Sequence, residues 1–101
     1  MDYLLKKDDR IINDIEEALS YYDDISLELG KHFETELLFT LNKIENHPHH
    51  YFNLNQKFRR INLQRFPYKL VYVIKEKEKE IIVLGLFHHY KHPGEIRKRS
   101  K

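Results

Sequence analysis

The chain has 101 residues, 41% of them hydrophobic and 34% charged, which predicts one folded domain (1–101) rather than a disordered segment or several domains. It has no cysteine, so a disulfide framework and a thiolate metal site are both excluded. The net charge is only +2 and no apolar run is long enough to span a bilayer, so we expect a cytoplasmic protein without membrane contact.

The charge is unevenly distributed along the chain. Residues 1–45 contain 12 acidic and 5 basic side chains, whereas residues 46–101 contain 4 acidic and 13 basic side chains. The first part therefore has a net charge of −7 and the second a net charge of +9, with no acidic residue between Asn46 and Lys75. This asymmetry predicts an acidic or polyanionic partner for the second part, although the two parts could also neutralise each other within the fold.

The first elements predicted are a short strand and a helix. Residues 2–6 are long enough only for an opening strand. Asp8 and Asp9 offer N-cap oxygens to a helix that we expect to end near residues 23–24. Apolar residues at a spacing of three to four form one stripe on this helix: Ile11, Ile12, Ile15, Leu19 and Tyr22.

A second helix is predicted between Ser26, which can cap its first turn, and Pro48, which stops it after His47. Gly30 weakens the first turn, so the break between the two helices could lie a few residues after Ser26. Its apolar stripe consists of Leu29, Phe33, Leu37, Leu41 and Ile44. Two amphipathic helices with a short connection predict an αα-hairpin.

The period then changes from that of helices to that of strands. Residues 58–63 alternate, which places residues 58, 60 and 62 on one face and residues 59, 61 and 63 on the other. Residues 68–75 and 80–87 are rich in Val, Ile and Tyr, and the charged turn 76–79 joins them as a hairpin. The predicted fold class is α+β, with an N-terminal strand and an αα-hairpin packed on one face of a small, largely antiparallel sheet. A basic tail, residues 91–101, follows.

Three motifs resemble those of a known family. The first is the segment 58–72, in which Arg59 and Arg60 precede Phe66-Pro67-Tyr68 and the next strand. The second is the segment 86–93, an apolar-His-x-x-Lys-x-Pro ending, and the third is the helical hairpin itself. Together they resemble the ParE-like branch of the RelE/ParE toxin superfamily over nearly the whole chain. Two departures are the short, polar first strand and Lys91, which stands where an arginine is usual.

The resemblance implies the toxin of a bacterial type II toxin–antitoxin system, a growth inhibitor of the plasmid-stabilising kind that a cognate antitoxin neutralises. The superfamily contains two mechanisms, ParE-like inhibition of DNA gyrase and RelE-like cleavage of messenger RNA on the ribosome. We favour the first, which needs no enzymatic activity, because the predicted central strands contain Val71, Val73, Ile82 and Leu84 rather than a dense set of Lys and Arg. An inactive interaction module is a third interpretation.

The candidate site residues follow from the two mechanisms. A nuclease must move protons and stabilise an anionic phosphate, and the residues that could do so are Arg59, Arg60, Arg65, His88, His89 and Tyr90. The candidates for binding an acidic partner are Lys57, Arg59, Arg60, Arg65, Lys91 and Arg97. Other interpretations remain open, because the arginines could form a solvated strand edge or pair with the acidic helices.

Several residues are assigned to structure rather than chemistry. We expect His88 to be packed and hydrogen-bonded at the end of a strand, and Tyr68 and Tyr72 to lie in the core. The seven histidines gather at 47–50 and 88–92, but with no cysteine and no spacing typical of metal ligands we expect neither a metal nor a cofactor.

Overall fold

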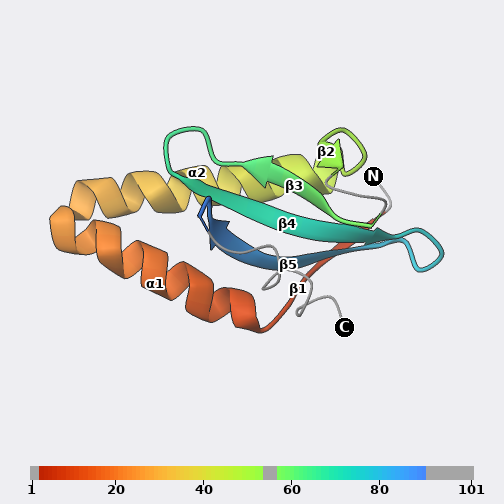
Figure 1. The fold of residues 1–101 in the computed structure, drawn as a ribbon, viewed down its shortest axis with the longest axis horizontal. Coiled ribbons are helices and arrows are strands. Elements are labelled where there is room, and N and C mark those ends of the chain that lie inside the picture. Colours follow the sequence, from red (N-terminus) through yellow and green to blue (C-terminus); the bar gives the residue numbers. More distant parts are fainter. Residues whose placement is uncertain (1–2, 54–56, 91–101) are drawn as a thin grey trace.

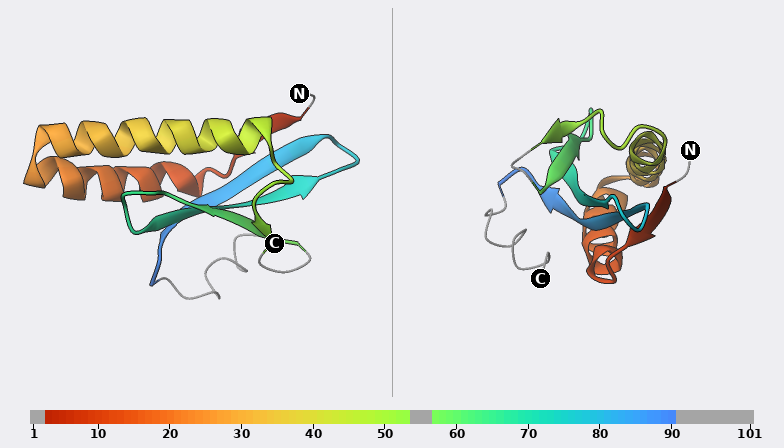
Figure 2. Two further views of the ribbon diagram at one scale, coloured as in Figure 1. Left: turned by 90° about the horizontal axis from the view of Figure 1, so that it is seen from above. Right: turned by 90° about the vertical axis from the view of Figure 1, so that its right-hand side faces the viewer.

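The computed structural model describes residues 3–53 and 57–90, which form two helices and a sheet (Figure 1). The elements in chain order are β1 (Leu4–Lys7), α1 (Arg10–Ile25), α2 (Leu27–Asn46), β2 (Phe52–Asn53), β3 (Arg59–Asn62), β4 (Tyr68–Lys75) and β5 (Glu80–His88). The described strands form one five-stranded sheet in the order β1-β5-β4-β3-β2. The helical hairpin covers one face of this sheet (Figure 2), so the predicted α+β fold is confirmed.

The sheet is mixed rather than wholly antiparallel. β1 runs parallel to β5, with Leu4 opposite Glu80 and Lys7 opposite Val83, whereas the other neighbouring strands pair antiparallel. An ion pair of 2.6 Å between Lys6 Nζ and a Glu80 carboxylate oxygen supports this edge. The β4–β5 hairpin matches its predicted bounds to within one residue, whereas β2 was not predicted, because two residues leave no periodic signal.

The start of α1 differs in detail from the prediction. Asp9 occupies the N-cap position but makes no capping hydrogen bond through its side chain. Asp8 provides that bond instead, because its Oδ1 accepts the backbone N–H of Arg10 at 2.9 Å. The predicted stripe was wrong at Ile12, which is 60% exposed, whereas Ala18 is buried. Ile12 follows the buried Ile11 by one position, a rotation of about 100° that turns it away from the sheet.

The two helices meet at Ser26, where the sequence predicted a cap. The Leu29 backbone N–H donates to Ser26 Oγ at 3.0 Å, and α2 begins at Leu27. The later break suggested by Gly30 was therefore wrong. Gly30 instead lies where α2 passes α1, because a β-carbon at this position would come within 1.7 Å of the carboxylate oxygen Oδ1 of Asp23. The Asp23 carboxylate thus occupies the space that a side chain at residue 30 would take, while the Asp23 α-carbon would lie 3.4 Å from such a β-carbon, an ordinary contact distance.

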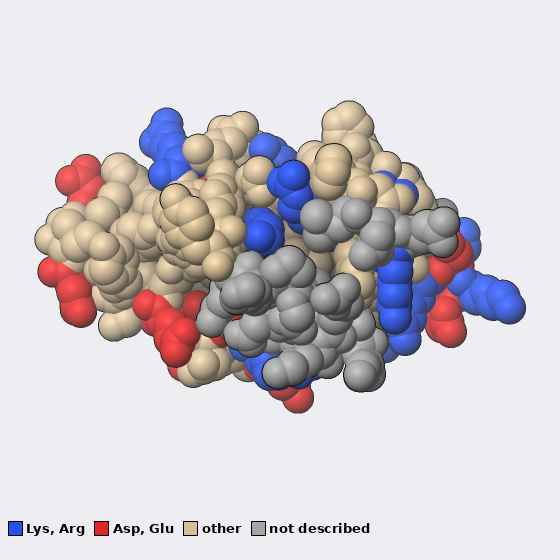
Figure 3. All heavy atoms as spheres, in the orientation of Figure 1, with Lys and Arg blue, Asp and Glu red and all other residues tan. Residues whose placement is uncertain are grey.

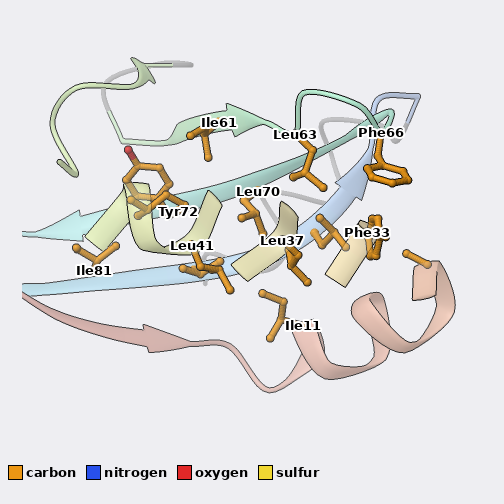
Figure 4. Packing of buried hydrophobic residues seen from close by; sticks show 14 of the residues in the cluster. Ile11, Phe33, Leu37, Leu41, Ile61, Leu63, Phe66, Leu70, Tyr72 and Ile81 are labelled. Atoms are coloured by element: carbon orange, nitrogen blue, oxygen red, sulfur yellow. The ribbon is translucent and has the colours of Figure 1, made fainter. Parts of the chain in front are cut away.

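The main core lies between the helical hairpin and the sheet. Figure 4 shows side chains of the sheet, among them Leu70 and Tyr72, lying opposite Phe33, Leu37 and Leu41 of α2. Tyr72 is fully buried, as predicted, and its hydroxyl donates to the carbonyl of Pro48 at 2.6 Å. Burial raises the pKa of Tyr72 to about 12. This hydrogen bond ties the segment after α2 to the centre of the sheet.

The opposite face of the sheet has a smaller apolar cluster, consisting of Phe58, Val71, Val73, Leu84 and Phe87. An irregularity in β5 contributes to it. Val71 lies opposite Gly85 and Tyr72 opposite Val83, so Leu84 is an extra residue on its strand, a β-bulge. Beyond the end of β1, the carboxylate of Asp14 accepts the Leu86 backbone N–H at 3.0 Å, so a side chain of α1 continues the hydrogen bonding along the edge of β5.

In the described part of the chain, neither helix combines the length and the apolar character needed to cross a membrane.

Candidate functional site

A basic pocket of about 280 Å³ opens on the face of the sheet that the helices do not cover. Its lining residues are Arg60 and Asn62 of β3, Lys69 of β4, and His89, which follows β5. The register of the sheet brings them together, because Asn62 lies directly opposite Lys69 and alternation places Arg60 on the same face as Asn62. Figure 3 shows Lys and Arg side chains gathered around this part of the molecule.

Two contacts hold Arg60 in place. Its guanidinium lies 4.5 Å from the ring centre of Phe52, a cation–π contact, and donates to Asn62 Oδ1 at 2.9 Å. Burial, followed by the positive charge of Arg60, lowers the pKa of Lys69. Two cations close enough to disfavour each other's charge are stabilised by a bound anion, so the arrangement suits a phosphate or a carboxylate.

His89 is attached to the rest of the site through its backbone. Its N–H donates to the carbonyl of Pro67 at 2.9 Å, which joins the end of β5 to the loop before β4. The imidazole then lies at the pocket beside Lys69. Since a histidine can exchange a proton near neutral pH, it is the residue in this pocket best suited to acid–base chemistry.

Arg59 lies on the other face of β3 and binds backbone rather than lining the pocket. Its Nη1 donates to the carbonyl of His49 at 3.1 Å and to the carbonyl of Tyr51 at 3.0 Å. Both carbonyls belong to the connection between α2 and β2. The guanidinium therefore holds this connection against the edge of the sheet.

Arg65 lies at a third place, in the loop between β3 and β4. The Glu36 carboxylate of α2 accepts the backbone N–H groups of Gln64 and Arg65, the latter at 3.0 Å. The Arg65 side chain borders a separate pocket of about 340 Å³ beside α2, which His32 and Phe39 also line. The three arginines at positions 59, 60 and 65 are close together in the sequence but lie at three different places in the structure.

His88 and Tyr90 contact each other at the end of β5. The backbone N–H of Tyr90 donates to His88 Nδ1 at 3.2 Å, and the two rings lie 5.1 Å apart. The His88 ring also meets Tyr68 edge-on at 5.2 Å. Tyr90 itself is 88% exposed. This geometry supports a structural role for His88, which stays a prediction.

Three candidate residues remain, of which the structure describes only Lys57. Lys57 lies over the ring of Phe58, 5.8 Å from its centre, next to the smaller apolar cluster. Lys91 and Arg97 lie outside the described residues. His49 of the first histidine group contacts Glu76 at 2.7 Å rather than its neighbours. Over residues 3–53 and 57–90, no group of three or more potential ligands could hold a metal ion.

Sequence reasoning missed Asn62 and Lys69 as site residues. The signal was present in part, because alternation already placed residue 62 on the face of residue 60. Adding the pairing of residues 59–62 with the next strand would have brought in Lys69.

Comparison with known proteins identifies the type of fold that holds this site. Residues 5–93 match the family described as the ParE toxin of the type II toxin–antitoxin system parDE. No curated protein sequence matches the chain.

Among solved structures, the chain is similar to the chromosomal ParDE system from P. aeruginosa, with a TM-score of 0.72, 18% identity, and coverage of 86% of this chain and 96% of that one. It is similar to a mutant of the E. coli toxin RelE in the free state, with a TM-score of 0.51, 18% identity, and coverage of 98% of this chain and 94% of that one. It is also similar to the archaeal RelE–RelB complex from Pyrococcus horikoshii OT3, with a TM-score of 0.58, 15% identity, and coverage of 91% of this chain and 100% of that one. At these identities the structural likeness supports the fold alone.

Proposed function

Because the chain belongs to the ParE toxin family of type II toxin–antitoxin systems, we propose that it inhibits growth by binding DNA gyrase without catalysing a reaction, and that a cognate antitoxin neutralises it. The observation that carries this proposal is the family match over residues 5–93. The central strands agree with it, because apolar residues such as Val71, Val73 and Leu84 form the middle of the face that holds the basic pocket.

The distribution of the candidate residues also favours binding over catalysis. Arg59 is occupied by two carbonyls, Arg65 lies beside α2, and His88 accepts a backbone hydrogen bond. A nuclease built from the predicted set would need these side chains to converge on one phosphate. A binding surface has no such requirement, since cations spread over several elements can each contact a large partner.

The antitoxin is the partner that we assign to the basic pocket. Solved neighbours of the chain include a RelE–RelB complex and RelE bound to a RelB peptide. An acidic antitoxin segment would complement the net charge of +9 on residues 46–101. Its carboxylates could pair with Arg60 and Lys69, which relieves the repulsion between the two cations.

The pocket also supports a second candidate function, ribosome-dependent cleavage of messenger RNA. In that case His89 could exchange protons with the ribose 2′-hydroxyl and the leaving oxygen. Arg60 and Lys69, both cationic, would stabilise the anionic phosphate. The observation in favour is that these three side chains line one pocket.

The experiment that tests the proposal is pulse-labelling after induction of this protein alone in bacteria, with DNA and protein synthesis followed separately. An early arrest of DNA synthesis, together with inhibition of supercoiling by purified gyrase, supports the proposed function. An early arrest of protein synthesis, with messenger RNA cut in translating ribosomes, would replace it by the nuclease. If the protein is the nuclease, Lys69→Met should abolish the cleavage of messenger RNA. If it binds gyrase, the supercoiling assay is the discriminating measurement.

A further inference from the structure

A pocket of about 380 Å³ lies where the end of α1 meets the loop before β4 and the end of β5. It is separate from the basic pocket of Arg60 and Lys69, with which it shares no lining residue. Its lining residues are Tyr21, Tyr22, Ile25, Pro67, Tyr68 and His88. Four of these six have aromatic rings, so the pocket is defined mainly by ring surfaces.

Neighbouring rings of the pocket stand at steep angles to one another and enclose the space between them. Tyr21 meets Tyr22 at 81° with centres 5.1 Å apart, and Tyr22 meets Tyr68 at 70° and 6.4 Å. Tyr68 in turn meets His88 at 80°. Tyr21 and Ile25 are 61% and 58% exposed, so one side of the pocket is open to solvent. The face of a tyrosine ring is electronegative, and several such faces around one space attract a cation.

His88 does not oppose a cation in this pocket. Its Nδ1 accepts the backbone N–H of Tyr90, which requires an unprotonated nitrogen at that position. The imidazole contributes an aromatic surface to the pocket.

The charges around the pocket are negative. Residues 11–30 contain six acidic side chains and no basic one. Glu17 precedes Tyr21 by four residues and Asp24 follows it by three, so both lie on the helix face of Tyr21. Burial chiefly, and the negative charge of Glu17 in addition, raise the pKa of Tyr68. Figure 3 shows acidic side chains along α1 and around the end where the two helices meet.

We propose that this aromatic pocket binds an arginine side chain presented by a basic segment of a partner protein. Arginine fits better than lysine, because its planar guanidinium can stack on a ring while its N–H groups reach carboxylates such as Glu17 and Asp24. The acidic segment proposed for the basic pocket would be repelled here. This pocket is a different surface from the basic pocket assigned to the antitoxin, and its role does not depend on whether gyrase or messenger RNA is the target.

The test is a titration of the complete chain, followed by NMR, with a capped pentapeptide of alternating glycine and arginine. The matched probe is the same peptide with citrulline, the neutral isostere, in place of arginine. The arginine peptide should shift the resonances of Tyr21, Ile25 and Tyr68, and the citrulline peptide should not. Tyr21→Ala should weaken binding by about threefold to tenfold, as expected for one cation–π contact, whereas Tyr21→Phe should retain it.

Phe39→Ala is the matched control, because Phe39 is an aromatic residue of similar exposure (58%) that lines a different pocket. It should leave the affinity for the arginine peptide unchanged. Equal binding of the citrulline peptide would overturn the proposal, since the pocket would then be a neutral groove. Self-association of the chain that Tyr21→Ala abolishes would also overturn it, because the occupant would then be a second copy.

Discussion

Arg59 and Arg60 are neighbours in the sequence but make different contacts in the structure. Arg59 donates to two backbone carbonyls of the α2–β2 connection, whereas Arg60 lies over Phe52 at the basic pocket. The alternation of side chains along a strand separates them, because successive residues point to opposite faces. The same residue type can therefore stabilise the fold at one position and offer charge to a partner at the next.

This separation predicts opposite results from the same substitution at the two positions. Arg59→Ala should lower the free energy of unfolding by about 1–2 kcal/mol, because two hydrogen bonds from a charged donor are lost. Arg60→Ala should change stability little and should weaken binding of the antitoxin, and Arg60→Glu should weaken it further. Chemical denaturation and titration calorimetry at two salt concentrations measure these quantities. Unchanged affinity of Arg60→Glu at low salt would show that the antitoxin does not use this pocket.

His88 allows a second prediction at the level of single residues. Its ring contacts Tyr68 and its Nδ1 accepts a backbone hydrogen bond, so His88→Ala should lower the free energy of unfolding by about 1 kcal/mol. Toxicity should fall only as far as the folded fraction falls. Thermal denaturation and a growth assay measure the two effects separately. A variant of full stability that has lost toxicity would establish a catalytic role for His88 instead.

The two helices come into contact at Gly30. In a helix interior alanine is favoured over glycine by about 1 kcal/mol, yet here a β-carbon would overlap the end of the exposed, flexible Asp23 side chain. We therefore expect Gly30→Ala to change the stability little, because moving the Asp23 carboxylate offsets the gain in helix propensity, whereas the Asp23 α-carbon, 3.4 Å from such a β-carbon, need not move.

A second substitution distinguishes this overlap from other causes. In an Asp23→Ala background the space is open, so Gly30→Ala should become stabilising by about 1 kcal/mol, the propensity difference alone. The double-mutant cycle, measured by chemical denaturation, should then give a coupling energy that is clearly different from zero. Additive effects of the two substitutions would mean that Gly30 is required for another reason.

At the scale of the whole molecule, Glu76 joins three segments that are distant in the sequence. Its carboxylate accepts the hydroxyl of Tyr3, which precedes β1, and contacts His49, which follows α2. Lys79, at the other end of the β4–β5 turn, lies 5.3 Å from the centre of the Tyr3 ring. The hydrogen bond from Tyr3, followed by that from His49, lowers the pKa of Glu76 below its ordinary value of 4.5.

A depressed pKa in the folded state sets the sign of a pH dependence. The contribution of Glu76 to stability is present at pH values above its ordinary pKa of 4.5 and is lost as the pH falls through the lower pKa of the folded state. The difference in unfolding free energy between the natural protein and Glu76→Gln should therefore shrink as the medium is acidified. Denaturation curves at a series of pH values test this, with Glu34→Gln, in the middle of α2, as the control. A difference that stays constant on acidification would contradict the role of the carboxylate.

The electrostatic surface of the whole molecule has two regions of opposite sign, and they suit different partners. Cations of β3 and β4 surround the basic pocket, whereas the acidic face of α1 borders the aromatic pocket. The net charge of +2 conceals this division. Binding at both regions should weaken as the salt concentration rises, because exposed charges are screened within about 10 Å at 0.1 M salt.

Sequence alone predicted most of the secondary structure, because its signals are local. The stripes of both helices, the cap at Ser26 and the hairpin of residues 68–75 and 80–87 depend on residues within a few positions of one another. The motifs of residues 58–72 and 86–93 similarly predicted the family, which the match over residues 5–93 confirms. The errors were also local in kind, as at Ile12, which is apolar but lies one position off the buried stripe.

Only the tertiary structure decided which residues meet. The basic pocket requires the register between β3 and β4, which sets Asn62 opposite Lys69, and the loop contact that brings His89 beside them. The parallel pairing of β1 with the distant β5 likewise has no local signature. Such contacts join segments that lie far apart in the chain, so their geometry follows from the packing of the helical hairpin on the sheet and not from any stretch of sequence alone.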